Sequence, residues 1–481
     1  MTQFIGRTNE LKTLNRLLEK QTASLVILKG RRRIGKSRLI EEFSNDKHFY
    51  VFSGLPPTAE TSKQSQLDEF AEQLHLQTGL PEIKADDWNK LFLLLAEKVK
   101  QESVIILFDE ISWMGSKDAD FLGKLKNAWD LYFKKNPDLI LVLCGSVSAW
   151  IEKNIVNSTG FMGRPSMYMT LEELPLNECN QFWDKQNGNI SPFEKFKILA
   201  VTGGVPRYLE LINPKIPAEE NIKQLCFVKN GPLLNEFEHI FSDIFSKRSG
   251  IYKKIVTQLV KGPATAEKLA KDVKLIRTGT FDDYLNDLVL SGFIARDYTW
   301  HLNTNKPSKL SQFRLKDNYI RFYLKYILPN KAKIEKDRYQ NVSLTSLPGW
   351  ETIMGLQFEN LVLNNYVSII NLLNIKPEEV IVDNPFFQRP TARQKGCQID
   401  YLIQTKFDTI YICEIKFSKH LVGMNVISEV KEKIKRLNIP RHISRRPVLI
   451  HVNGVTDDVL DADYFANIID FSELLNPTSL T

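Results

Sequence analysis

The chain has 481 residues, of which 43% are hydrophobic and 25% charged, and its formal net charge is +7. This composition is typical of a globular protein with two to four domains. No apolar run approaches the ~18 residues needed to span a bilayer. The N-terminus lacks the basic-then-apolar pattern of a signal peptide, and the five cysteines show no CxxC spacing. We therefore expect a cytoplasmic protein without a membrane span, a disulfide framework or a zinc site.

Positive charge is concentrated in two stretches of the chain. Residues 247–333 hold 18 Lys and Arg against 7 Asp and Glu, and residues 388–446 hold 13 against 5. A positive surface attracts polyanions, which favours nucleic acid as a partner. Solvated lysines explain either stretch equally well, so charge alone leaves both interpretations open.

The first motif is Gly30-Arg31-Arg32-Arg33-Ile34-Gly35-Lys36-Ser37, the pattern of a nucleotide-binding P-loop. Residues 25–29 predict a buried strand before it, and residues 37–43 predict a helix after it. The backbone N–H groups of such a loop form a cradle for phosphates. We expect Lys36 to reach the β- and γ-phosphates of ATP, and the Ser37 hydroxyl to ligate Mg²⁺. The nucleotide-binding residues expected here are Gly30, Arg33, Gly35, Lys36, Ser37 and Arg38.

Two further apolar runs predict parallel strands of the same sheet. Residues 104–108 form one run, which ends in Asp109 and Glu110. We expect Asp109 to hold Mg²⁺ and Glu110 to polarise the attacking water as a catalytic residue. Residues 139–143 form the other run, and Ser146 follows it, either as a γ-phosphate sensor or as a turn residue.

These motifs give residues 1–245 a resemblance to the prokaryotic P-loop ATPases of the AAA+ and STAND group. The lead-in Phe4-Ile5-Gly6-Arg7 and the segment Gly203-Gly204-Val205-Pro206-Arg207 also resemble that group, in which the second segment opens a lid helix. The resemblance implies that Pro206 borders the adenine and that Arg207 contacts the phosphates. It also implies a γ-phosphate contact for Arg164, although a plain surface arginine remains the alternative. Oligomerisation around the nucleotide is a further expectation from the family.

Residues 246–330 predict a different kind of domain. Helices are expected at 251–260, 266–273 and 280–290, followed by a β-hairpin at 293–302, an order that resembles a winged helix. The third helix carries Asp282, Asp283 and Asp287, which phosphates repel. We therefore favour an interdomain or partner-binding module, while a DNA contact through other surfaces stays open. Residues 331–348 are expected to be a linker.

Residues 349–481 predict an αβββαβ order that resembles the PD-(D/E)xK restriction-endonuclease-like fold. Asp400 lies in one expected strand, and strand alternation places Glu414 and Lys416 on the same face of the next. The two carboxylates predict a site for Mg²⁺ or Mn²⁺, with Lys416 beside it, and these three residues are the expected catalytic groups. Glu359 matches an additional acidic ligand position of that family. A salt-bridged pair on an amphipathic strand is the alternative.

The predicted fold class is therefore α/β: a P-loop NTPase parallel sheet with a helical lid, a winged-helix middle domain and a restriction-endonuclease-like C-terminal domain. Over the whole chain, this order resembles a family of prokaryotic ATPases that end in a nuclease-like domain. The expected function is an ATPase whose nucleotide state controls a metal-dependent nuclease acting on nucleic acid, with DNA favoured. The alternative is a nucleotide-dependent switch whose C-terminal domain binds nucleic acid or protein without cutting it.

Overall fold

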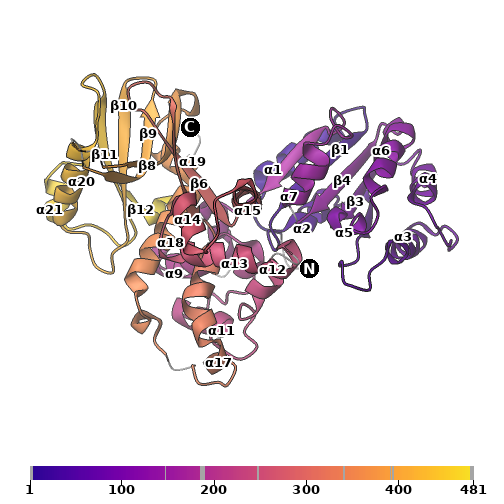
Figure 1. The fold of residues 1–481 in the computed structure, drawn as a ribbon, viewed down its shortest axis with the longest axis horizontal. Helices are drawn as coiled ribbons and strands as arrows, with labels where there is room; N and C mark the ends of the chain where they lie inside the picture. The colour runs from indigo at the N-terminus through magenta and orange to yellow at the C-terminus, as the bar shows by residue number, and fades with distance from the viewer. Residues whose placement is uncertain are drawn as a thin grey trace. The chain divides into compact units, whose positions relative to one another are not determined.

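A computed structural model describes residues 4–146, 148–184, 190–245, 249–339, 342–390, 392 and 395–476. The chain divides into two compact units, residues 1–172 and residues 173–481 (Figure 1). Within the described ranges, no helix has the length and apolar character required to cross a membrane.

The first unit is a parallel five-stranded sheet with the strand order β2-β3-β4-β1-β5. Continuous apolar runs form its central strands because helices bury both faces of the sheet. One face packs on α1 and α2, and the other packs on α3, α4 and α6. The strands are β1 (Ser24–Gly30), β2 (His48–Ser53), β3 (Val104–Asp109), β4 (Leu139–Gly145) and β5 (Met167–Leu171). The helices are α1 (Thr8–Leu18), α2 (Lys36–Phe43), α3 (Lys63–Thr78), α4 (Trp88–Lys98), α5 (Ile111–Met114), α6 (Phe121–Leu131) and α7 (Ser148–Ile151), with short turns at Phe133–Lys135 and Glu152–Val156.

The second unit begins with helices that share one hydrophobic core with its C-terminal end. That core contains buried side chains from Leu174 to Leu475. The first helices are α8 (Leu176–Asp184), α9 (Pro192–Thr202), α10 (Pro206–Leu209), α11 (Ala218–Cys226) and α12 (Glu236–Phe245).

Three helices and an antiparallel hairpin follow, in the order expected for residues 246–330. They are α13 (Ser249–Gln258), α14 (Ala266–Asp272), α15 (Gly279–Leu290), β6 (Ile294–Trp300) and β7 (Pro307–Leu315), with a short turn at Leu259–Lys261. A single bridge joins Ala264 to Phe313, so the loop before α14 lies beside the hairpin. The winged-helix interpretation of this segment stays a prediction.

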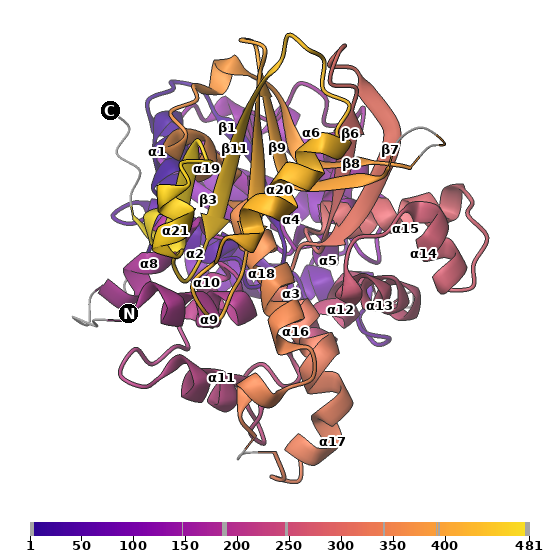
Figure 2. The same cartoon turned by 90° about the vertical axis from the view of Figure 1, so that its left-hand side faces the viewer.

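A second five-stranded sheet, in the order β12-β11-β10-β9-β8, occupies the C-terminal part. Neighbouring strands pair antiparallel from β8 to β10 and parallel from β10 to β12. Figure 2 shows α20 lying across one face of this sheet. The strands are β8 (Val380–Gln388), β9 (Cys397–Thr405), β10 (Thr409–Lys416), β11 (Ser444–His451) and β12 (Asn467–Asp470). The helices are α16 (Asn318–Phe322), α17 (Lys331–Ile334), α18 (Trp350–Asn364), α19 (Tyr366–Leu372), α20 (Asn425–Arg436), α21 (Asp457–Asp461) and α22 (Phe471–Leu475), with short turns at Tyr323–Ile327, Leu328–Asn330, Leu344–Ser346 and Pro377–Glu379.

This division into two units differs from the four segments expected from the sequence. The expected boundary at residue 245 falls inside the second unit, because α8–α12 pack into the same core as α18. The expected linker at 331–348 contributes Ile334, Leu344 and Leu347 to that core. The described residues of this stretch, 331–339 and 342–348, therefore contribute to the packing of the second unit.

Candidate functional site

The loop between β1 and α2 has the backbone of an anion cradle. Arg33 and Gly35 adopt left-handed conformations, with φ of 70° and 87°. A side chain at Gly30 would place its Cβ 2.5 Å from the carbonyl oxygen of Leu171, so only glycine fits there. The loop ends at the N-terminus of α2, where backbone N–H groups favour a bound phosphate.

Lys36 lies inside this loop. Its side chain is buried, and Nζ donates to the carbonyl oxygens of Gly30, at 3.0 Å, and of Arg31, at 3.1 Å. The carbonyl groups of Gly30 and Arg31 thus hold the Lys36 ammonium inside the loop, where the phosphates of a nucleotide would bind.

Ser37 and Asp109 come together from different elements. The Ser37 hydroxyl, on the first turn of α2, donates to Asp109 Oδ2, at the end of β3, over 2.6 Å. A hydroxyl and a carboxylate this close offer two oxygen ligands to a single hard cation such as Mg²⁺. The pair therefore fits the metal of a nucleotide–Mg²⁺ complex.

Glu110 follows Asp109 and has a left-handed backbone, with φ of 49°. Its carboxylate accepts hydrogen bonds from the Ser146 hydroxyl, at 2.9 Å to each oxygen, and from the Ser146 amide, at 3.2 Å. Ser146 follows β4, so the carboxyl ends of three strands meet beside the loop. The structure thus brings together Lys36, Ser37, Asp109, Glu110 and Ser146.

Asp400 and Glu414 lie on adjacent strands of the second sheet. Asp400 Oδ2 accepts a hydrogen bond from the Ile415 amide at 2.9 Å. Lys433 Nζ, from α20, contacts Glu414 Oε2 at 2.5 Å and Asp400 Oδ1 at 3.6 Å. The oxygens of both carboxylates are therefore within reach of one cation, and in this structure that cation is the lysine ammonium.

Burial and like charge act on the carboxyl groups around this point. Burial and the charge of Asp400 raise the pKa of Glu414 to about 7, although Lys433 acts in the opposite direction. Burial and Asp400 likewise raise the pKa of Glu359, on α18, to about 7, against the influence of Arg314 and Arg321. Burial lowers the pKa of Lys433, but Asp400 and Glu414 outweigh it, so the pKa is raised. Ionisation of the carboxyl groups at this corner is unfavourable, and a further cation would stabilise their ionised forms.

Lys416 lies on the same face as Glu414, as strand alternation predicts. Its Nζ pairs with Glu429 Oε2 at 2.5 Å. Glu429 and Lys433 are four residues apart on α20, so this helix presents charges opposite to those of Lys416 and Glu414. Two parallel ion pairs hold the helix to the strand.

Residues 4–212 match a family model described as an ATPase domain predominantly from Archaea. The chain carries an archaeal-type ATPase domain. The match extends past Glu172 and covers α8, α9 and α10 of the second unit as well as the whole first sheet.

Other proteins are similar to longer or shorter parts of the chain. An uncharacterised protein of Methanocaldococcus jannaschii is 24% identical over 375 residues, which are 78% of this chain and 79% of that protein. An uncharacterised ATP-binding protein of the same organism is 43% identical over 47 residues, which are 10% of this chain and 80% of that protein. Among solved structures, the Walker-type ATPase of Pyrococcus abyssi covers 67% of this chain and 96% of its own, with 16% identity and a TM-score of 0.49. The ORC2 protein of Aeropyrum pernix, solved as ADPNP–ADP complexes, covers 69% and 97%, with 14% identity and a TM-score of 0.41.

Arg164 of the ATPase domain does not lie beside the phosphate loop of its own chain, and its expected γ-phosphate contact stays a prediction. It pairs with Asp130 Oδ2 at 2.7 Å. The backbone amide of Ser166, two residues on, donates to the carbonyl oxygen of Leu25 at the start of β1, whereas the loop follows the end of β1. The length of the strand therefore separates Arg164 from the P-loop of its own chain.

Three other expected nucleotide ligands stay predictions. Arg38 pairs with Glu41 on α2 at 3.2 Å. Pro206 and Arg207 begin α10 in the second unit, where Arg207 pairs with Glu210 at 3.1 Å. Gly204, two residues before Pro206, is required for packing, since a Cβ at this position would lie 2.3 Å from the carbonyl oxygen of Leu174.

The C-terminal site fits a metal as a pair of carboxylates, and not as the predicted set of three. Among the described residues, no group of three or more His, Cys, Asp and Glu side chains is arranged to hold a metal ion. The charge of Asp400 thus acts on Glu359, but Glu359 does not complete a ligand group. Lys433 was not predicted from the sequence. The available signal was its position four residues after Glu429 on an expected helix. Four residues of a helix span a length similar to the two residues of a strand that separate Glu414 and Lys416.

Proposed function

We propose that the chain binds and hydrolyses ATP at the site formed by Lys36, Ser37, Asp109 and Glu110. The observation that carries this proposal is the 2.6 Å hydrogen bond from Ser37 to Asp109 beside a buried Lys36 inside the phosphate loop. The match to an archaeal ATPase family supports it.

Each residue has a defined task in this proposal. ATP would supply the reacting phosphoanhydride, and Mg²⁺ would neutralise charge on its oxygens. Lys36, now held by two loop carbonyl groups, would bind phosphate oxygens, and Ser37 and Asp109 would hold the cation. Glu110 orients the water for attack, while Ser146 fixes the direction of the Glu110 carboxylate.

The second proposed activity is metal-dependent cleavage of nucleic acid, with DNA favoured, at Asp400, Glu414 and Lys416. The two carboxylates share a cation position, and a Mg²⁺ or Mn²⁺ ion held there would supply an activated water. Lys416 would then leave Glu429 to offset negative charge at the phosphate. The pKa values of Glu414 and Glu359, both raised to about 7, support a site that gains from added positive charge.

Control of cleavage by nucleotide is proposed to act through the shared core of the second unit. The ring of Phe196, on α9, contacts the ring of Phe358, on α18, with centroids 5.5 Å apart. Asn318 joins the same two helices through the carbonyl oxygens of Leu199 and Gln357. Glu359 follows Phe358, so a displacement of α9 would reach the carboxylate site through packed side chains.

A specific observation favours the alternative, a nucleotide-dependent switch that does not cut. Lys433 already satisfies Glu414, and the described residues hold no three-ligand metal group. Under this alternative, the segment from α13 to β7 acts as a winged-helix partner module. Its α15 presents Asp282 and Asp287, which pair with Arg277 and Tyr252 within the segment.

The experiment that tests both proposals measures ATP hydrolysis and cleavage of plasmid and single-stranded DNA with Mg²⁺ or Mn²⁺, with and without ATP. Lys36→Ala, Asp400→Asn and Lys416→Ala are compared with Lys419→Ala, which removes a lysine outside the carboxylate pair. Metal-dependent cleavage that disappears in Asp400→Asn and Lys416→Ala establishes the nuclease, and the Lys36→Ala result shows whether ATP controls it. Intact ATP hydrolysis without cleavage under any condition supports the switch.

A further inference from the structure

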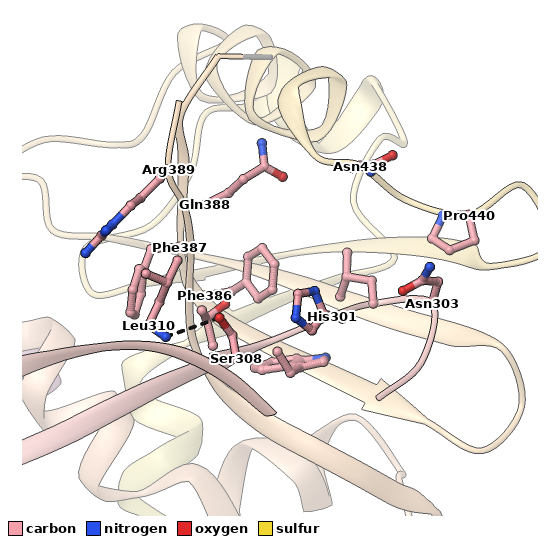
Figure 3. A pocket seen from close by; sticks show the side chains of 13 residues that line it. His301, Asn303, Ser308, Leu310, Phe386, Phe387, Gln388, Arg389, Asn438 and Pro440 are labelled. Atoms are coloured by element: carbon pink, nitrogen blue, oxygen red, sulfur yellow. Dashed lines mark hydrogen bonds between the residues drawn. The ribbon is translucent and has the colours of Figure 1, made fainter. Parts of the chain in front are cut away.

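A cavity of about 610 Å³ lies between the hairpin of β6 and β7 and the end of β8, within the second unit (Figure 3). Its volume is in the range of sites that bind small organic ligands, ~300–1,000 Å³. The hairpin, the end of β8 and the loop after α20 all contribute lining residues. None of these residues takes part in the ATPase site or in the carboxylate pair.

The walls of the cavity are held in place by buried contacts. Trp300 is 4% exposed, and its Nε1 donates to Gln404 Oε1 at 2.7 Å. Gln404 in turn donates to the carbonyl oxygen of Leu302 at 2.9 Å. The rings of Trp300 and Phe386 meet edge-to-face with centroids 5.2 Å apart. The hairpin is therefore fixed to the C-terminal sheet, and the cavity is preformed.

The lining combines aromatic rings with polar side chains. Figure 3 shows the rings of Phe386 and His301 near the centre, with Asn303 and Asn438 to one side. The amide groups of these two asparagines and the ring nitrogens of His301 supply hydrogen-bond donors and acceptors along the lining.

The cavity shares a wall with the carboxylate site. Gln388 lines the cavity, pairs with Cys397 across the strands and donates to the carbonyl oxygen of Arg436 at 3.0 Å. Cys397 and Arg436 line a second hollow of about 360 Å³, together with Asp400 and Lys433. The Gln388 side chain and the C-terminal end of α20 thus separate the cavity from the hollow at Asp400.

We propose that the cavity binds one nucleotide base, next to a phosphate in the hollow at Asp400. A base is planar and apolar on its faces and has donors and acceptors along its edge, and aromatic rings with amide side chains complement both features. This inference rests on the proposed action on nucleic acid. The same chemistry is offered by an unpaired base of a strand and by a free nucleotide. An unpaired base is required because the edges of a paired base are already used.

The test is a binding titration in EDTA, where cleavage cannot occur. Fluorescein-labelled single-stranded 15-mers and the blunt duplex of the same sequence are titrated with the full chain, with dAMP and dCMP as competitors. Asn303→Trp places a large side chain at the cavity. Thr304→Trp, at the next residue of the same turn and outside the lining, is the matched control. His301→Ala removes a lining ring without adding bulk.

We expect single strands to bind more tightly than the duplex, and Asn303→Trp to weaken that binding at least about tenfold, as loss of one stacked base would. Thr304→Trp should bind as the wild type, and His301→Ala should fall between the two. Competition by dAMP or dCMP at low concentration, lost in Asn303→Trp, would assign the cavity to a free nucleotide. Binding that is equal in Asn303→Trp and wild type, for both kinds of ligand, overturns the proposal. Cleavage is measured separately, so a cavity that binds in a chain that does not cut separates this inference from the nuclease.

Discussion

The hydroxyl of Ser146 lies 2.9 Å from both carboxylate oxygens of Glu110, and the Ser146 amide adds a third contact at 3.2 Å. Ser146 follows β4 and Glu110 follows β3, so the relationship joins the ends of two neighbouring strands. A carboxylate held on both oxygens has a fixed direction, which is what a group that orients water requires. The Glu110 carboxylate would lose this fixed direction if the Ser146 hydroxyl were removed.

Ser146→Ala should therefore lower the rate of ATP hydrolysis about tenfold, since a hydrogen bond to a charged group is worth roughly 1.5–3 kcal/mol. ATP affinity should not change, because the Ser146 hydroxyl is bonded to Glu110 while Lys36 lies inside the phosphate loop. Steady-state hydrolysis and equilibrium binding of a fluorescent ATP analogue give the two readouts. Ser148→Ala is the control, since that buried hydroxyl has no hydrogen-bond partner among the described residues. A matched loss in Ser148→Ala would contradict the prediction.

Lys433→Gln should increase the affinity of the C-terminal site for Mn²⁺ at least about tenfold. The ammonium of Lys433 competes for Glu414 and Asp400, and removing a charge at this distance favours another cation. Calorimetric titration of the full chain with Mn²⁺ checks this in Lys36→Ala backgrounds, where the nucleotide site is disabled. Lys431→Gln, on the same helix with its ammonium over the Tyr464 ring, is the control. An unchanged Mn²⁺ affinity in Lys433→Gln would count against a cation site at this pair.

Asp130 gives a pH-dependent contribution to the stability of the first unit. Hydrogen bonds from Arg164 hold the pKa of Asp130 well below its usual value of 3.8. A lowered carboxyl pKa stabilises the folded state above the unfolded-state pKa, and this stabilisation is lost as the pH falls below about 4. Asp130→Asn should lower the free energy of unfolding by about 1 kcal/mol at pH 7, and the difference should shrink at acid pH.

Urea unfolding of the two proteins between pH 3 and pH 7 measures this difference. Asp138→Asn, at an exposed position just before β4, provides the comparison. A difference that stays constant across the range would show that Asp130 acts through packing and not through its charge.

Gln404→Leu should destabilise the second unit by about 2 kcal/mol. The change leaves Trp300 Nε1 and the Leu302 carbonyl oxygen buried without their partner. The midpoint of urea unfolding should fall, and the hairpin should become more sensitive to protease. Gln398→Leu alters an exposed position of the same strand and should have little effect. If both variants unfold alike, the hairpin is not held by these bonds.

The sequence was most informative where function depends on residues close to strand ends. The P-loop, Asp109, Glu110 and Ser146 could be placed because each follows an apolar run, and parallel strands bring their carboxyl ends together. The αβββαβ order of the C-terminal part could be read from strand alternation, which also placed Glu414 and Lys416 on one face.

Contacts between elements distant in the chain were not predictable in the same way. Lys433 reaches Glu414 through the packing of α20 on the sheet, and one basic helix residue resembles another in sequence. Arg164 was assigned by family position, but its carboxylate partner on α6 decides where it lies. The polar composition of residues 331–348 suggested a linker, while three apolar residues within it decided its burial.

The core of the second unit has a consequence for synthesis of the protein. Phe196, on α9, packs against Phe471, on α22, with ring centroids 5.7 Å apart, and the backbone amide of Leu176 donates to Asn365 Oδ1. The first helices of the unit thus depend on residues that are synthesised much later. The first unit contains its own complete sheet and can fold while the rest is translated, whereas α9 lacks part of its packing partners until α22 has been made.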